Sequence, residues 1–291
     1  MFGKNSVGRL TAAVFGVLAT AASAVHADQD VLNRLDVAER QGMLTQRMVK
    51  SACFAARGIG ADLHLDYLAE AHDQFETSLL ALREGSGMLQ LLPETKPSLL
   101  MAQRRVMDAW PEMDRPIKAI IRDRTTSTET ILELQPISLA IKAIAEDAAQ
   151  RTAMAYSDDA SGASFTQNMT VDIAARQRTL TQNMVKQACL MGISDDLSTL
   201  TADLAEAINL FDLSLNALQN GLPDAGVMAP PTDEIAKGLS LVKTEWTALK
   251  PAFQAAVEGD VPEAERLIVM DHAAEKMLEI MDEVVSLYSG I

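Results

Sequence analysis

The sequence predicts an all-α fold made of two tandem antiparallel four-helix bundles that form a pseudo-two-fold pair. Three observations support this prediction. The composition is rich in Ala, Leu, Met, Gln and Glu, and only 4% of the residues are aromatic, which favours helices over strands. Apolar residues recur at spacings of three and four rather than at alternate positions. Finally, one unit occurs twice along the chain, which predicts two similar domains.

The repeat is clearest in a stretch of 18 residues. "DVAERQGMLTQRMVKSAC", from Asp36, matches "DIAARQRTLTQNMVKQAC", from Asp172, at 12 of 18 positions without a gap. The same offset of 136 residues aligns "LAEAHDQFETSLLALREG" in the first copy with "LAEAINLFDLSLNALQNG" in the second, and it also aligns Trp110 with Trp246.

Residues 1–27 are expected to be a cleaved secretory signal peptide. Lys4 and Arg9 form a short basic start, "LTAAVFGVLATAASA" follows as an apolar segment, and "VHA" supplies small residues for cleavage after Ala27, with Ala24 as the second choice. The less favoured alternative is a retained membrane anchor, because the apolar segment is shorter than the roughly 20 residues that a spanning helix needs. We therefore expect a soluble exported protein, periplasmic in a Gram-negative source.

Helix-breaking segments divide each copy into four predicted helices. In the first domain, residues 28–160, the breakers "RGIGAD", "LLPETKP" and "DRTTST" separate helices at 29–57, 62–91, 97–124 and 128–157. In the second domain, residues 161–291, the breakers "GISDD", "GLPDAGVMAPPT" and "EGDVP" separate helices at 165–193, 196–220, 231–258 and 261–289. Four amphipathic helices with short connections bury their apolar faces most simply as an antiparallel bundle.

The arrangement of the two bundles follows from the helix count. Four antiparallel helices return the chain to the end where it began, and the polar segment "SDDASGA" is expected to break the helix between the copies. The first helices of the two copies can then lie parallel and side by side, so that one chain imitates a two-fold dimer. End-to-end stacking through fused flanking helices is the alternative.

Cys53 and Cys189 are the only cysteines in the sequence, and they occupy the same place in the two copies. Export permits a disulfide. A bridge also requires the two Cα atoms to lie within about 7 Å of each other, and each cysteine is expected near the core of its own bundle. We therefore predict that the two cysteines are buried and unpaired.

Composition and motifs exclude several classes of function. With 25 basic and 40 acidic residues the formal net charge is −15, which disfavours nucleic acid as a partner. The sequence contains no nucleophile elbow, P-loop, dinucleotide-binding glycine motif, Glu-x-x-His pair or haem-attachment motif. His64, His72 and His272 do not form a metal-binding pattern. We expect no enzymatic activity, no cofactor and no metal.

The repeated motif carries a family resemblance. "AARQRTLTQNMVK" and, less closely, "AERQGMLTQRMVK" resemble the "GRQRMLSQRM" motif of PilJ-type domains, the N-terminal sensory modules of type IV pilus methyl-accepting chemotaxis proteins. Those modules are similar in turn to the periplasmic domains of nitrate and nitrite sensor kinases. The resemblance covers both copies and implies helical bundles that bind nitrate or nitrite between paired first helices, centred on an arginine from each.

The two copies divide the arginines of this motif between them. The second arginine of the family's "RQR" falls on Arg178 in the second copy but on Gly42 in the first. The later arginine falls on Arg47 in the first copy but on Asn183 in the second. The glycine before "RQR" is replaced in both copies, by glutamate in the first and by alanine in the second.

At 100° per residue, Arg178 and Gly42 fall on matching stripes of small side chains. We expect Gly42 to leave room for the Arg178 guanidinium, a planar donor suited to nitrate, nitrite or a carboxylate. The side chains expected to complete the ligand's hydrogen bonds are those of Thr45, Thr181, Gln46 and Gln182. Three further arginines are expected on nearly the opposite face, where locking the bundle is favoured over ligand binding, and they are kept as second-tier ligand candidates: Arg40, Arg176 and Arg47. The alternative for Arg178 is an ion pair within its own bundle, or a solvated position.

The expected function is that of an exported sensory or ligand-binding protein for a small planar anion, with nitrate or nitrite favoured. It would act through a membrane sensor or chemoreceptor partner. A small organic carboxylate is the alternative ligand, since it suits the same guanidinium. The alternative function is a helical protein–protein interaction module that has lost ligand binding.

Overall fold

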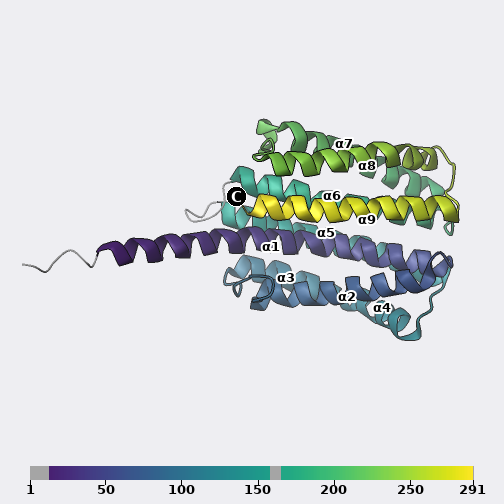
Figure 1. The fold of residues 1–291 in the computed structure, drawn as a ribbon. Coiled ribbons are helices and arrows are strands. Elements are labelled where there is room, and N and C mark those ends of the chain that lie inside the picture. The colour runs from purple at the N-terminus through teal and green to yellow at the C-terminus, as the bar shows by residue number, and fades with distance from the viewer. Residues whose placement is uncertain (1–12, 158–164, 291) are drawn as a thin grey trace, which may run out of the picture.

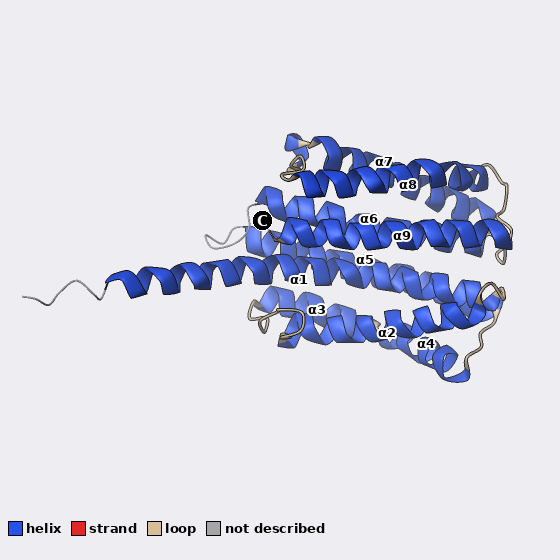
Figure 2. Ribbon diagram, in the orientation of Figure 1, coloured by secondary structure: helices blue, strands red, loops and turns tan. Residues whose placement is uncertain are grey.

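A computed structural model describes residues 13–157 and 165–290, with side chains for 29–156 and 165–290. Within these residues the all-α prediction is confirmed, because the structure consists of helices and connecting turns without strands (Figures 1 and 2). The helices are α1 (Ala13–Ala56), α2 (Ala61–Glu84), α3 (Pro97–Ala109), α4 (Pro111–Asp123), α5 (Thr128–Ser157), α6 (Phe165–Leu190), α7 (Leu197–Asn220), the short 3₁₀ helix η1 (Pro223–Ala225), α8 (Asp233–Val257) and α9 (Ala264–Ser289).

The helices of each repeat pack mainly on one another. In the first repeat α1 contacts α2 and α5, and α3 packs against α5. In the second, α6 contacts α7 and α9, and α8 packs against both of these. The most extensive contact joins the repeats, along α1 and α6, which begin at the same end of the molecule (Figure 1). The first helices are therefore side by side and parallel, and end-to-end stacking is wrong. The predicted boundary at residue 160 lies outside the described residues and stays a prediction.

Cys53 and Cys189 form a disulfide between α1 and α6, with their Cα atoms 6.3 Å apart. The prediction that they are unpaired is wrong. Each cysteine is buried, as expected, but the parallel first helices lie in register, so the equivalent positions 53 and 189 face each other across the contact. The bridge joins residues separated by 136 positions, which is the offset of the repeat.

Two predicted helices end differently in the structure. The helix expected at 97–124 is divided into α3 and α4 at Trp110, because Pro111 has no amide hydrogen to continue the backbone ladder. Trp110 itself keeps helical dihedrals, with φ −53° and ψ −41°. The helix expected at 62–91 ends at Glu84, because Gly85 adopts φ +82°, a conformation that glycine takes without steric cost.

The start of α1 overlaps the predicted signal peptide. The helix begins at Ala13, and its N-terminal part projects beyond the other helices (Figure 1). Residues 1–12 lie outside the described part of the chain, and cleavage after Ala27 stays a prediction. Within the described residues, no helix combines the length and the apolar character needed to span a membrane.

Candidate functional site

Arg178 lies in the contact between the repeats, and its side chain has no exposed surface. Its Nη2 donates to Asp36 Oδ1 of α1 at 2.5 Å, its Nη1 donates to Asp282 Oδ1 of α9 at 2.6 Å, and its Nε donates to the backbone oxygen of Ala175 at 3.3 Å. Arg178 therefore connects three helices, and both arms of its guanidinium already hold a carboxylate.

Arg40 shares the two carboxylates with Arg178. Its Nη2 lies 3.1 Å from Asp36 Oδ2 and 3.3 Å from Asp282 Oδ1. Arg40 was expected on nearly the opposite face from the ligand arginine, but the two arginines come from different helices and meet across the contact. We call Asp36, Arg40, Arg178 and Asp282 the arginine–carboxylate cluster. It reaches the surface through its carboxylates, since the Asp36 and Asp282 side chains are 22% and 37% exposed.

The pKa shifts of Asp36 and Arg178 favour the charged forms of both side chains. Burial opposes ionisation of Asp36, but Arg178 and Arg40 outweigh it and hold the pKa of that carboxyl below its usual value. Burial likewise disfavours the charged Arg178 guanidinium, but Asp36 and Asp282 outweigh it and raise its pKa. Asp36 and Arg178 therefore form a charged pair at neutral pH.

Gly42 does not make room for the Arg178 guanidinium, and this expectation is corrected. A Cβ at Gly42 would lie 3.7 Å from Glu146 Cγ, 3.8 Å from Thr179 Oγ1 and 4.0 Å from Lys142 Cγ. The position faces α5 and the residue after Arg178, so Gly42 and Arg178 lie on opposite sides of the contact, whereas Cys53 and Cys189 meet within it. The guanidinium instead points toward α1 and α9.

The other predicted ligand side chains are buried, and several are already hydrogen-bonded. Thr45 and Thr181 donate to backbone oxygens of their own helices. Gln46 donates to Thr45 Oγ1 at 2.9 Å, and Gln182 donates to Glu275 Oε1 at 3.1 Å. The structure therefore does not gather these four side chains around the Arg178 guanidinium.

Arg47 belongs to a second charged group, further along α1. Its Nη2 lies 2.9 Å from Glu275 Oε2, and its guanidinium lies over the Tyr67 ring at 5.3 Å from the centroid. Lys50, fully buried, contacts Asp271 at 2.6 Å and Glu275 at 2.5 Å. Burial opposes ionisation of Glu275, but Lys50 and Arg47 outweigh it and lower its pKa. Arg47 thus connects α1 with α9 through an ion pair.

Lys186 is the counterpart of Lys50 in the second repeat, but it lacks the acidic partners. The positions equivalent to Asp271 and Glu275 hold Gln135 and Leu139. Lys186 is fully buried, and its Nζ donates to Gln46 Oε1 at 2.5 Å, with no carboxylate paired to it among the described residues. Burial, with a smaller effect of Lys142, lowers the pKa of Lys186 to about 7. This buried amine was missed by the sequence analysis.

Lys186 is expected to make the fold more stable as pH rises from about 7 to about 10. In this range the unfolded chain holds the lysine proton, with a pKa of about 10.4, and the folded chain has released it, so raising pH favours the folded state. The wild type should gain on the order of 2 kcal/mol between pH 7 and 9 relative to Lys186→Met, measured by urea denaturation. Equal pH slopes for the two proteins would contradict the assignment.

Arg176 lies in a third charged group on the other side of the contact between repeats. Its Nε lies 3.1 Å from Asp172 Oδ2, and its Nη2 lies 3.9 Å from Glu39 Oε1. Glu39 is buried, and neither of its carboxyl oxygens has a hydrogen-bond partner among the described residues. Burial, reinforced by Asp172, raises the pKa of Glu39 well above its usual value. Glu39 is therefore a poor counter-ion, and part of the Arg176 side chain, 36%, stays exposed.

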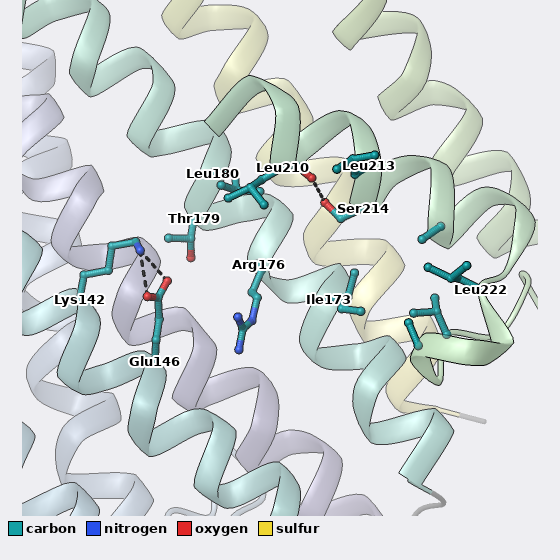
Figure 3. Close-up of a pocket in the computed structure, with 13 residues that line it drawn as sticks. Lys142, Glu146, Ile173, Arg176, Thr179, Leu180, Leu210, Leu213, Ser214 and Leu222 are labelled. Atoms are coloured by element: carbon teal, nitrogen blue, oxygen red, sulfur yellow. Dashed lines mark hydrogen bonds and ion pairs between the residues drawn. The ribbon is translucent and has the colours of Figure 1, made fainter. Parts of the chain in front are cut away.

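A cavity of about 400 Å³ opens beside Arg176, between α5, α6, α7 and the segment after α7 (Figure 3). Its polar end is formed by Lys142, Glu146, Arg176 and Thr179, and its other walls are mainly apolar, with Ile173, Leu180, Leu210, Leu213, Leu222 and Val227. Lys142 and Glu146 form an ion pair at 2.7 Å. The cavity is therefore amphipathic, with charges of both signs at one end.

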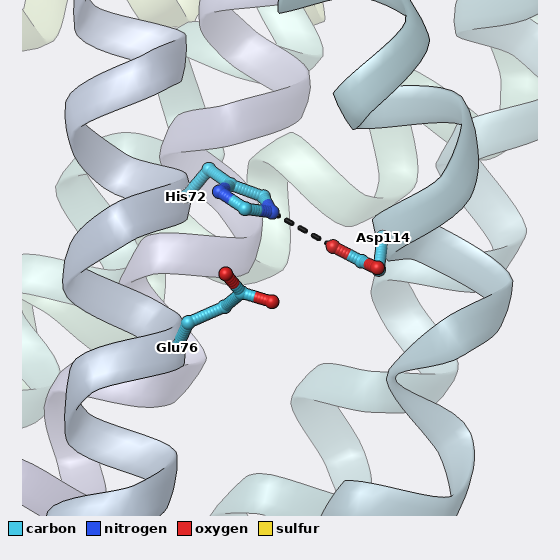
Figure 4. A group of neighbouring side chains, drawn as sticks. All are labelled: His72, Glu76 and Asp114. Carbon is cyan, nitrogen blue, oxygen red and sulfur yellow. Dashed lines mark hydrogen bonds and ion pairs between the residues drawn. The ribbon is translucent and has the colours of Figure 1, made fainter.

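His72, Glu76 and Asp114 form a separate group of potential metal ligands on α2 and α4 (Figure 4). His72 Nε2 lies 2.8 Å from Asp114 Oδ1. The ammonium group of Lys118 lies 3.0 Å from Glu76 Oε1 and 3.0 Å from Asp114 Oδ1, and it supplies the positive charge that the two carboxylates need. The group is complete as an ion-pair network, and we assign no metal to it.

These features define an all-helical tandem-repeat protein whose repeats meet along buried ion pairs. The chain belongs to the PilJ family, described as the N-terminal domain of the type IV pili methyl-accepting chemotaxis transducer, whose profile matches residues 22–132 and 166–268. The two matched segments agree with tandem PilJ-type domains. A search of curated proteins found no match to the chain. Family membership indicates a sensory role related to chemotaxis transducers, without specifying a ligand.

Proposed function

We propose that the protein is an exported, periplasmic sensory module that detects a small planar anion, nitrate or nitrite, and passes the signal to a membrane sensor or chemoreceptor partner. Export rests on the predicted signal peptide at residues 1–27, and the sensory role rests on family membership. The protein supplies binding and a change in helix packing, and the partner supplies transmission.

The observation that supports this proposal is the position of Arg178. It is fully buried in the contact between the repeats, yet both of its carboxylate partners come from other helices and reach the surface. A dissolved anion that replaces the Asp282 carboxylate keeps the guanidinium paired while it releases α9 from α6. Binding of an anion at Arg178 is therefore coupled to the packing of helices from both repeats.

Replacement of a carboxylate implies modest affinity. Nitrate has to compete with a carboxylate held at 2.6 Å, so only the difference between two charged hydrogen-bonding interactions favours binding. We expect a dissociation constant in the micromolar to millimolar range. Ligand at 100 times this concentration then adds about 2.7 kcal/mol of stability, which corresponds to several degrees in melting temperature.

The test is a thermal-shift titration of the wild type and Asp282→Asn with nitrate, nitrite and acetate. Asp282→Asn leaves Arg178 Nη1 without its charged partner, so the shift caused by nitrate should be larger than in the wild type. Arg178→Lys should lose the shift, because an ammonium group lacks the planar guanidinium that holds Asp36 on one arm and the anion on the other. The control Arg47→Ala should respond nearly as the wild type does. The anion proposal is wrong if neither wild type nor Asp282→Asn responds at about 10 mM anion.

The second candidate is an interaction module that has lost ligand binding. It is favoured by the complete pairing of the Arg178 guanidinium within the chain. In that case the anion titrations do not shift the melting temperature. The Arg178→Lys variant still binds a purified chemoreceptor sensory domain.

A further inference from the structure

Three leucine side chains around the cavity beside Arg176 are more exposed than packing requires. Leu210, Leu213 and Leu222 are 45%, 62% and 46% exposed, and all three line the cavity (Figure 3). Single exposed leucines are common on protein surfaces, but three that converge on one cavity form an apolar wall in contact with water. Such a wall is stabilised when an apolar group covers it.

The polar end of the same cavity offers hydrogen-bonding groups that are incompletely used. The Thr179 hydroxyl is buried and has no hydrogen-bond partner among the described residues, and Arg176 Nε lies 3.1 Å from Asp172 Oδ2 without hydrogen-bond geometry. Arg176 and Glu146 both line the cavity, so it presents a planar cation and a carboxylate to the same space (Figure 3). A ligand in this cavity can accept hydrogen bonds from Arg176 and donate hydrogen bonds to Glu146.

The first repeat contains the equivalent cavity, with a different lining. A cavity of about 470 Å³ lies beside Arg40, the counterpart of Arg176. The positions equivalent to Leu210 and Leu213 hold Gln74 and Thr77, and Arg40 is held there by two carboxylates. The fold therefore does not require leucines at these positions, and their presence in the second repeat needs another explanation.

We propose that the cavity between α5, α6 and α7 binds a small zwitterion with an aliphatic side chain, the chemistry of an aliphatic α-amino acid. The ligand's carboxylate pairs with the Arg176 guanidinium, its ammonium group donates to Glu146, and its side chain covers the leucine wall. The volume of about 400 Å³ lies in the range of small-molecule sites. The site adds to the proposed sensory role and does not depend on anion binding at Arg178.

The charges around the cavity favour a zwitterion over a simple carboxylate. Arg176 and Lys142 are balanced by Asp172 and Glu146, all within one connected group of α5 and α6 side chains. Burial and the neighbouring Asp172 raise the pKa of a fifth acidic or basic group nearby, Glu39, which disfavours a further negative charge there. A ligand with a net charge would leave one charge unbalanced in a partly buried place, whereas a zwitterion would not.

Isothermal titration calorimetry with three matched probes tests the ligand class. L-Leucine carries both charged groups, 4-methylpentanoate lacks the ammonium group and 3-methylbutylamine lacks the carboxylate. We expect L-leucine to bind in the micromolar to millimolar range and the other two to bind at least about tenfold more weakly. Equal affinity for all three, or no binding of L-leucine, overturns the proposal. Binding of 4-methylpentanoate alone overturns it in favour of an aliphatic carboxylate.

The repeat supplies matched variants for locating the site. Leu210→Gln with Leu213→Thr introduces the first repeat's residues at exposed positions, so the fold should be retained and leucine affinity should fall about tenfold or more. The control, Gln74→Leu with Thr77→Leu, makes the reverse change in the other cavity and should leave leucine affinity unchanged. Circular dichroism melting verifies folding of both. Equal leucine affinity in the two double variants contradicts the location.

Two further measurements separate this inference from the anion proposal. Arg176→Gln should abolish leucine binding and keep the nitrate response, whereas Arg178→Lys should abolish the nitrate response and keep leucine binding. Leucine binding without a nitrate response means that the amino-acid site holds and the anion site fails. A nitrate response without leucine binding means the opposite.

Discussion

Replacing both Cys53 and Cys189 by alanine is expected to lower the free energy of unfolding by about 3 to 5 kcal/mol. The disulfide joins residues 136 positions apart, and a cross-link over so long a segment removes much of the conformational freedom of the unfolded chain. The melting temperature should fall on the order of 10 °C. Urea denaturation of the oxidised wild type and the double variant measures the difference.

Alanine is the right replacement because both sulfur atoms are buried, and serine would add the cost of a buried hydroxyl. The control is the wild type under a reducing agent, which should approach the stability of the double variant. The double variant itself should not change on reduction. If oxidised and reduced wild type unfold at the same urea concentration, the bridge is absent from the protein in solution.

Arg178→Met is expected to lower the free energy of unfolding by about 2 to 4 kcal/mol at pH 7, the second large effect. Removal of the guanidinium leaves Asp36 and Asp282 side by side with only Arg40 as a partner. The loss lies below that of a fully enclosed ion pair, because both carboxylates are partly exposed. Urea denaturation at pH 7 measures it.

The difference in stability between the wild type and Arg178→Met should decrease at low pH. The pKa of Asp36 is lowered in the fold, so its ion pair with Arg178 adds stability above the ordinary aspartate pKa of about 3.9. That stability is lost as pH falls through the lower folded value, and the gap between wild type and Arg178→Met should narrow below about pH 4. Arg40→Met is the control, with an expected loss under about 1 kcal/mol, since Arg40 is 32% exposed. Equal losses would contradict the central role of Arg178.

The sequence predicted the helices and the contact between repeats because both depend on local or repeated patterns. Amphipathic spacing and breakers located the helices to within a few residues at most ends, and the offset of 136 placed the first helices in register. The same register, taken literally, also predicts that Cys53 faces Cys189. The error lay in treating the two cysteines as belonging to separate cores.

The partners of the charged residues were harder to predict. Asp36 lies four residues before Arg40, a spacing that indicates a pair on one helix face. Asp282 comes from the last helix, and no local pattern connects it with Arg178, more than 100 residues earlier. The cavity beside Arg176 depends on packing among three helices, which a sequence pattern does not describe. One signal for it is visible in the sequence, since the second copy has Leu210 and Leu213 where the first copy has Gln74 and Thr77.

The position of the disulfide restricts how the two repeats can move. It joins α1 and α6 near their C-terminal ends, while the arginine–carboxylate cluster lies about 25 Å away along α1, at 1.5 Å per residue. A covalent link at one end prevents α1 from sliding along α6 as a piston does. It still permits a rotation about the disulfide, in which the N-terminal ends of α1 and α6 move apart. A change in packing at Arg178 therefore acts far from the point of rotation. The displacement grows with distance from the disulfide, so it is largest at the projecting start of α1.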